Sequence, residues 1–114
     1  MSNALRGRRF GAAIGLRDAA LALLQTNGKP SQAYGGSIVF ELHSPDNPTP
    51  RLSLVMSKHP LDGRLMLSVW AMLKGRHDKV LNIEWLGGKV ELVSFRRGEW
   101  ESELLAMGRV VTVH

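Results

Sequence analysis

Residues 64–95 read RLMLSVWAMLKGRHDKVLNIEWLGGKVELVSF, and this stretch decides the fold. Leucine, valine or alanine stands at every odd position from 65 to 73. A period of two residues is typical of a β-strand, because successive side chains point to opposite faces of a sheet. Residues 79–85 and 89–95 read as two further strands, separated by turns at 74–78 and at Gly87-Gly88. The stretch therefore predicts three consecutive strands joined by tight turns.

Two more strands are predicted upstream, because residues 37–43 and 51–57 also alternate apolar with other side chains. Residues 44–50 contain three prolines, which fix φ and remove backbone donors, so they predict a projecting loop. Short connections between successive strands favour antiparallel pairing of neighbours, that is, a β-meander. The β-branched residues within 109–114 predict a sixth strand at an edge of the sheet.

Helices are expected at both ends of the chain. Apolar residues from Leu16 to Leu24 recur at helical spacing, and Gly28 and Pro30 end a helix predicted over residues 16–26. A second helix is predicted over residues 98–107, with Gly108 as its C-terminal cap. The predicted fold class is therefore α+β: an antiparallel five- to six-stranded β-meander packed by an N-terminal and a C-terminal helix.

The 114 residues are enough for one domain with its own core. Residues 1–15 are basic and contain three glycines, so we expect a flexible basic arm there and a single α+β domain over residues 16–114. The start of the chain superficially resembles a signal peptide, but Arg17 and Asp18 interrupt its apolar part. No apolar run approaches the roughly 20 residues of a membrane helix. Because the chain also lacks cysteine, we expect a cytoplasmic protein without a membrane partner.

No catalytic or cofactor motif is evident in the sequence. The absence of cysteine excludes a disulfide framework, a thiolate metal site and a cysteine nucleophile. No Gly-x-Ser-x-Gly element occurs, and no two of the four histidines have the short spacing of a local metal site. The glutamates of the predicted strands are expected to be solvated charges rather than acid–base catalysts. The sequence thus predicts a protein that is not an enzyme and that holds no metal or cofactor.

Charge is the strongest functional signal. Fifteen Lys and Arg residues against ten acids give a net charge of +5, which favours a polyanionic partner such as nucleic acid. In a meander, alternate turns meet at the same end of the sheet, so cations distant in sequence converge there. The predicted phosphate-binding residues are Arg51, Lys74, Arg76, Lys79, Arg96 and Arg97, with Arg6, Arg8 and Arg9 on the N-terminal arm as an auxiliary set.

The strand over residues 64–73 is apolar on both faces, since Met66, Trp70 and Met72 alternate with the aliphatic series. A soluble monomer rarely exposes such a face. It is expected either to pair with a second copy, giving a homodimer, or to stack bases of single-stranded nucleic acid beside cations. Trp70 and Trp85 are therefore predicted as stacking or interface residues. The acidic helix at 98–107 is unsuited to reading the major groove of duplex DNA.

A curved antiparallel sheet followed by a helix resembles the general plan of small single-stranded-DNA-binding transcriptional coactivator domains. The first hypothesis is a small non-enzymatic nucleic-acid-binding protein, directed at the backbone of single-stranded DNA or RNA. The alternative is a protein-interaction or regulatory/inhibitor module that uses an apolar sheet face or a sheet edge. A third hypothesis, an enzyme with an unfamiliar site, requires a deep pocket with convergent polar groups.

Overall fold

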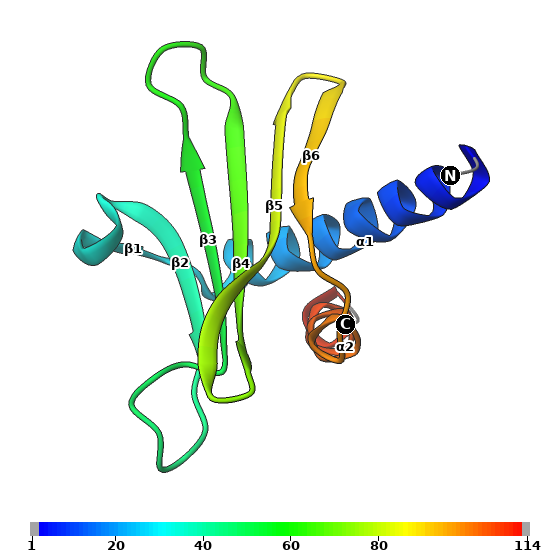
Figure 1. Ribbon diagram of the computed structural model, residues 1–114. Helices are drawn as coiled ribbons and strands as arrows, with labels where there is room; N and C mark the ends of the chain where they lie inside the picture. Colours follow the sequence, from blue (N-terminus) through cyan, green and yellow to red (C-terminus); the bar gives the residue numbers. More distant parts are fainter. Residues whose placement is uncertain (1–2, 113–114) are drawn as a thin grey trace.

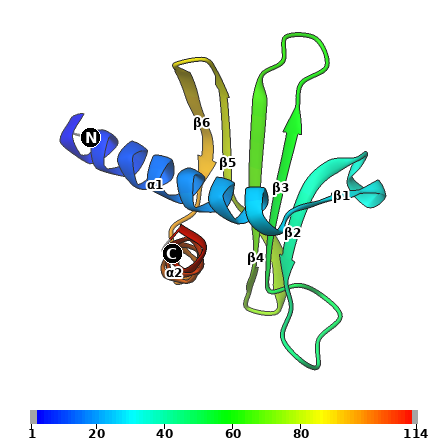
Figure 2. The same ribbon diagram turned by 180° about the vertical axis from the view of Figure 1, so that it is seen from behind.

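The computed structural model describes the chain from Asn3 to Thr112, and its side chains from Gly7 to Val111. Six strands form one antiparallel sheet in chain order, and two helices cover one of its faces, which confirms the predicted α+β meander (Figures 1 and 2). A 3-10 turn, η1 (Gln32–Tyr34), joins the first two strands. The elements are α1 (Asn3–Asn27), β1 (Lys29–Ser31), β2 (Ser37–Leu42), β3 (Leu52–Lys58), β4 (Leu65–Leu73), β5 (Arg76–Leu86), β6 (Lys89–Phe95) and α2 (Trp100–Thr112).

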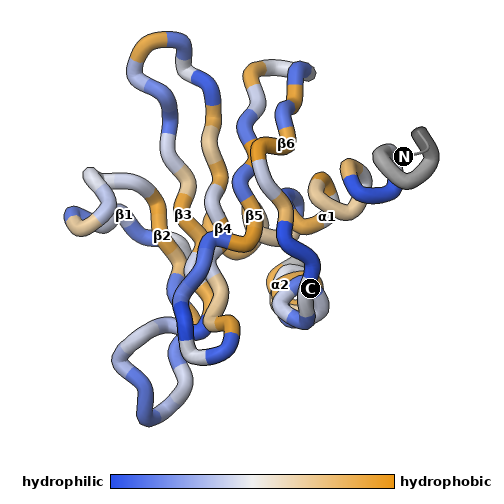
Figure 3. The backbone as a smooth tube through the Cα atoms, in the orientation of Figure 1, coloured by the Kyte–Doolittle hydropathy of each residue, from blue (hydrophilic) through white to orange (hydrophobic). Residues whose placement is uncertain are grey.

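The core lies between the sheet and the two helices. Directly opposed residues share a face of a sheet, and the row Phe40, Leu54, Val69, Leu81 and Phe95 crosses five strands beneath the helices. The three central members of this row are completely buried. Figure 3 shows the hydrophobic stretches along the strands and along α1, with hydrophilic residues in the loop between β2 and β3. The alternation of residue types in the sequence thus determines which face of each strand the helices cover.

The first helix is much longer than predicted, because α1 begins at Asn3 rather than near residue 16. Residues 3–15 of the segment predicted as a flexible arm are thus the first half of a helix, and residues 1–2 lie outside the described residues. The three glycines are four residues apart and lie on its outer side, where an added Cβ would meet no atom within 4 Å. Ala13 and Leu16 are buried on the opposite side. Packing of this inner side stabilises the helix and offsets the unfavourable propensity of glycine.

The second helix also extends beyond the prediction. It runs from Trp100 to Thr112, so residues 109–112 are helical and not a strand, while residues 113–114 lie outside the described residues. Gly108 is not a cap but a buried position where α2 meets α1, because a Cβ there would lie 2.7 Å from the Cβ of Ala19. The sixth strand is instead β1, which contains the Pro30 that was predicted only to end the first helix. Close contact between the helices therefore overrides the local signals of glycine and valine.

Two bulges interrupt the sheet at positions that the alternation does not reveal. Val69 pairs with Leu81 but Trp70 pairs with Lys79, so Val80 is an extra residue. Val93 is likewise extra in β6, between the pairs Asn82–Ser94 and Ile83–Leu92. A bulge reverses the alternation of the faces on either side of it. Lys79 therefore faces away from the helices although Leu81 faces toward them.

None of the helices in the described part of the chain is long and apolar enough to cross a membrane.

Candidate nucleic-acid interface

The six predicted cations lie on the half of the sheet that carries the β4–β5 turn: Arg51, Lys74 and Arg76 are next to the turn, and Lys79, Arg96 and Arg97 lie further along β5 and after β6. Figure 1 shows this turn at one end of the sheet. The amide of Met72 donates to the carbonyl of Arg51, and Arg76 pairs with Leu73 at the turn. Arg96 and Arg97 follow the last residue of β6 on the way to α2. We call this set the rim; its members are Arg51, Lys74, Arg76, Lys79, Arg96 and Arg97.

Acidic side chains engage four of the six rim cations. Two of these acids lie in α2: Arg51 contacts Glu103 at 3.1 Å, and Arg97 contacts Glu101 at 2.9 Å. The remaining two arginines share the carboxylate of Asp78, with Arg96 at 3.4 Å and Arg76 at 4.0 Å. These pairs are partly solvated and contribute little to stability, but they reduce the positive charge of the rim on its helix side.

Two lysines of the rim have no acidic partner among the ion pairs of the described residues. Lys74 lies in the two-residue β4–β5 turn, where its φ of 50° and the φ of 79° at Gly75 suit a type I′ hairpin. Lys79 lies on β5 and faces away from the helices. Both side chains are exposed to solvent. The uncompensated positive charge of the rim is therefore on the turn and on the helix-free side of the sheet.

An aromatic residue accompanies this charge. The Nζ of Lys79 lies 5.3 Å from the centre of the Trp70 ring, and the His77 ring is stacked on Trp70 with 5.8 Å between centroids. Trp70 pairs with Lys79 across β4 and β5, and His77 pairs with Met72, so all of them are on the helix-free face. We call Trp70, His77 and Lys79 the aromatic–cation cluster.

Two buried polar atoms at this cluster have no hydrogen-bond partner among the described residues: the Nε2 of His77, which belongs to the cluster, and the Oγ of Ser53, which pairs with Trp70 in the sheet. Ser53 is completely buried. An unsatisfied buried polar atom costs free energy, about 1–3 kcal/mol, and such atoms are often retained for function. The cluster therefore combines an aromatic ring, a cation and buried polar atoms without a partner.

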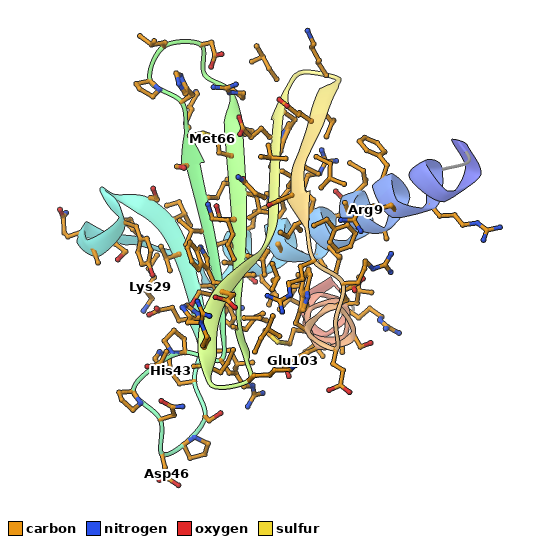
Figure 4. The ribbon with its side chains drawn as sticks, in the orientation of Figure 1. Arg9, Lys29, His43, Asp46, Met66 and Glu103 are labelled. Atoms are coloured by element: carbon orange, nitrogen blue, oxygen red, sulfur yellow. The ribbon has the colours of Figure 1, made fainter. Side chains whose placement is uncertain are left out.

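The helix-free face continues from the cluster toward β1. Glu41 pairs with Ser53 on this face, and a hollow of about 380 Å³ follows, lined in part by Lys29, Glu41 and His43. Figure 4 shows Lys29 and His43 on this side of the molecule, near the loop after β2. Lys29 forms no ion pair among those of the described residues. It adds a cation to the face that carries Lys79.

The other predicted site residues lie elsewhere. Trp85 is on the helix-covered face, where the guanidinium of Arg17 lies 4.9 Å from its ring centre. Arg9 donates a hydrogen bond to the carbonyl oxygen of Phe95 and lies 4.8 Å from the centre of its ring. Arg8 is exposed on α1. The side chain of Arg6 lies outside the described residues.

The sequence interpretation missed Ser53, His77 and Lys29. His77 stands two residues before Lys79, which is the spacing of side chains that share a face of a strand. This spacing predicts that His77 and Lys79 share a face, but only the position of the bulge at Val80 shows that this is the helix-free face. Lys29 lies in the unpredicted strand β1, and no local signal marks Ser53 as buried.

Among the residues that the structure describes, no group of three His, Asp or Glu side chains is placed to hold a metal ion. A scan against protein-family models, a search of curated proteins and a search of solved structures each gave no match to this chain. The chemistry of the helix-free face is therefore the basis on which a function is assigned.

Proposed function

We propose that this protein binds single-stranded nucleic acid on its helix-free sheet face, at the end of the β4–β5 turn. The observation that carries the proposal is the aromatic–cation cluster, in which Lys79 lies on Trp70; the unpaired Lys74 is in the turn that joins the same two strands. Proteins that bind single strands without base readout combine cations that follow the phosphates with aromatic rings that contact bases. Both chemistries occur here on one surface that no helix covers.

Electrostatics predicts the character of this binding. Lys29, Lys74 and Lys79 carry uncompensated charge, and Arg76 and Arg96 share a single acid. Neutralising roughly three or four phosphates releases counterions, so the logarithm of the binding constant is expected to fall with the logarithm of salt with a slope of about −2 to −3. Contacts of this kind position the strand but do not read its sequence.

Duplex DNA is expected to be a poorer ligand than a single strand, because neither helix is suited to the major groove. The first turns of α2 are acidic, and the outer side of α1 carries glycines, so neither helix offers a recognition surface for the major groove. The unpaired polar atoms of Ser53 and His77 lie on the sheet face instead.

The proposal is tested by fluorescence anisotropy with a labelled single-stranded oligonucleotide of about 16 nucleotides, in its DNA and RNA forms, and with the matching duplex. We expect saturable binding of the single strands at about 50 mM salt and much weaker binding at about 200 mM salt. Absence of binding to any of them at the lower salt concentration would overturn the proposal.

A matched pair of variants tests the location. Lys79→Gln removes a lysine of the cluster, whereas Lys58→Gln removes an exposed lysine at the far end of β3 that pairs with Leu65 on the helix side. Lys79→Gln is expected to weaken binding several-fold and to reduce the salt slope by about 0.7, the value for one phosphate contact on a single strand. Lys58→Gln should leave both unchanged. Equal effects of the two substitutions would place the ligand elsewhere.

A further inference from the structure

The outer edge of the sheet at β6 is open. β6 has seven residues, and its outer side pairs with no strand in the described part of the chain. An edge of unpaired backbone N–H and C=O groups is a template for another strand. The opposite edge, β1, has only three residues and contains Pro30, so it is a poor template. If the sheet is extended, the extension is therefore expected at β6.

The first turns of α1 form a shelf beside this edge, because they extend past β6 on the helix-covered side (Figures 1 and 2). Phe10 lies on this part of α1 with 40% of its surface exposed. It is seven residues from Arg17, which places both on the same side of the helix, and Arg17 covers Trp85, the partner of Val90 in β6. A strand added to β6 would thus lie over the shelf and bury Phe10 together with the half-buried Val90.

We infer that the added strand is β6 of a second copy of this chain. Lys89 and Glu91 flank Val90 and lie together on the helix-free face, opposite Leu86 and Glu84. In an antiparallel two-fold pair centred on Val90, Lys89 of each copy faces the partner's Glu91, and this charge pair forms twice. The edge is therefore complementary to itself in charge.

Two features of β6 favour the register in which the pair is centred on Val90. Arg9 donates a hydrogen bond to the carbonyl oxygen of Phe95, at the C-terminal end of β6, so this oxygen already has a partner. The extra residue Val93 disturbs the ladder just before that point. Both leave residues 89–92 of β6 as the free part of the edge, and a pair centred on Val90 lies within this segment. The resulting dimer would join two helix-free faces into one continuous surface.

The inference is tested by analytical ultracentrifugation of the full chain over a wide range of concentration, without nucleic acid, so that its outcome is independent of the proposed function. The chain is expected to dimerise reversibly. Lys89→Glu or Glu91→Lys alone places like charges opposite each other at two positions, and each should raise the dissociation constant of the dimer about tenfold or more. The double variant K89E/E91K restores opposite charges and should restore the dimer.

Lys58→Glu is the control for a change of net charge away from the edge, and thermal melting of each variant checks that it folds. A wild-type chain that sediments as a monomer at every concentration would overturn the inference. A strand of another protein would then be the remaining candidate partner of the β6 edge. A dimer that both single variants leave intact, or that the double variant fails to restore, would also overturn it, because either result places the interface elsewhere.

Discussion

Gly108→Ala is expected to destabilise this protein, although alanine is the better helix former. Gly108 is buried in α2, and a Cβ at this position would lie 2.7 Å from the Cβ and 2.9 Å from the Cα of Ala19 in α1. The substitution gains about 1 kcal/mol of helix propensity. The overlap involves the backbone of α1, which no rotamer change relieves, so the overpacking cost is expected near the upper end of about 1–3 kcal/mol. The net loss of unfolding free energy is therefore about 1–2 kcal/mol.

The same substitution at Gly11 is the matched control, because a Cβ there would meet no atom within 4 Å. Gly11→Ala should stabilise the protein by about 0.5–1 kcal/mol. A second control is Ala19→Gly in the Gly108→Ala background. It removes the atom nearest to the new methyl group but leaves the α1 backbone in place, so it should restore only part of the lost stability.

Urea unfolding followed by circular dichroism measures these effects as shifts of the midpoint at an unchanged m-value. In thermal unfolding, each kcal/mol should correspond to a change of roughly 4 °C in Tm. A Gly108→Ala variant as stable as the parent would refute the close approach of the two helices. A destabilised Gly11→Ala variant would show that the outer side of α1 is covered in solution.

Three further predictions concern single contacts. Ser53→Ala removes a buried hydroxyl that has no partner and should raise the unfolding free energy by about 1 kcal/mol; a loss in urea unfolding would show that the hydroxyl is satisfied. Arg9→Gln removes the contacts with Phe95 and should speed hydrogen exchange in the first turns of α1, whereas unchanged exchange would argue against this anchor. The pKa of the Asp62 carboxyl is lowered mainly because it accepts the amide N–H of Arg64 at 2.9 Å. This contribution to stability is present above the unfolded-state pKa and is lost as pH falls through the folded-state value, so Asp62→Asn should flatten the acid side of the stability curve. A carboxyl that titrates at its ordinary value by NMR would contradict this.

Much of the candidate site depends on contacts that local sequence does not encode. The meander order, readable from short turns, brings Arg51, Lys74 and Arg96 to one end of the sheet. Which of these cations remain uncompensated depends on α2, whose Glu101 and Glu103 reach back to Arg97 and Arg51. In the sequence, these glutamates are favourable charges at the N-terminus of a helix, because the helix dipole is positive there. The pair of Glu101 with Arg97 spans only four positions, whereas the pair of Glu103 with Arg51 joins residues 52 positions apart and is a tertiary effect.

By itself, the sequence determined the antiparallel meander and the faces of its central strands, because apolar alternation acts locally and a buried face tolerates no shift by one residue. Tertiary structure alone decided the bulge at Val80, the length of α1 and the burial of Gly108. Each of these depends on how two distant segments fit together in space, and packing free energy outweighs the small propensities that a sequence displays. The cluster of Trp70 with Lys79 exists because that bulge turns the lysine to the open face.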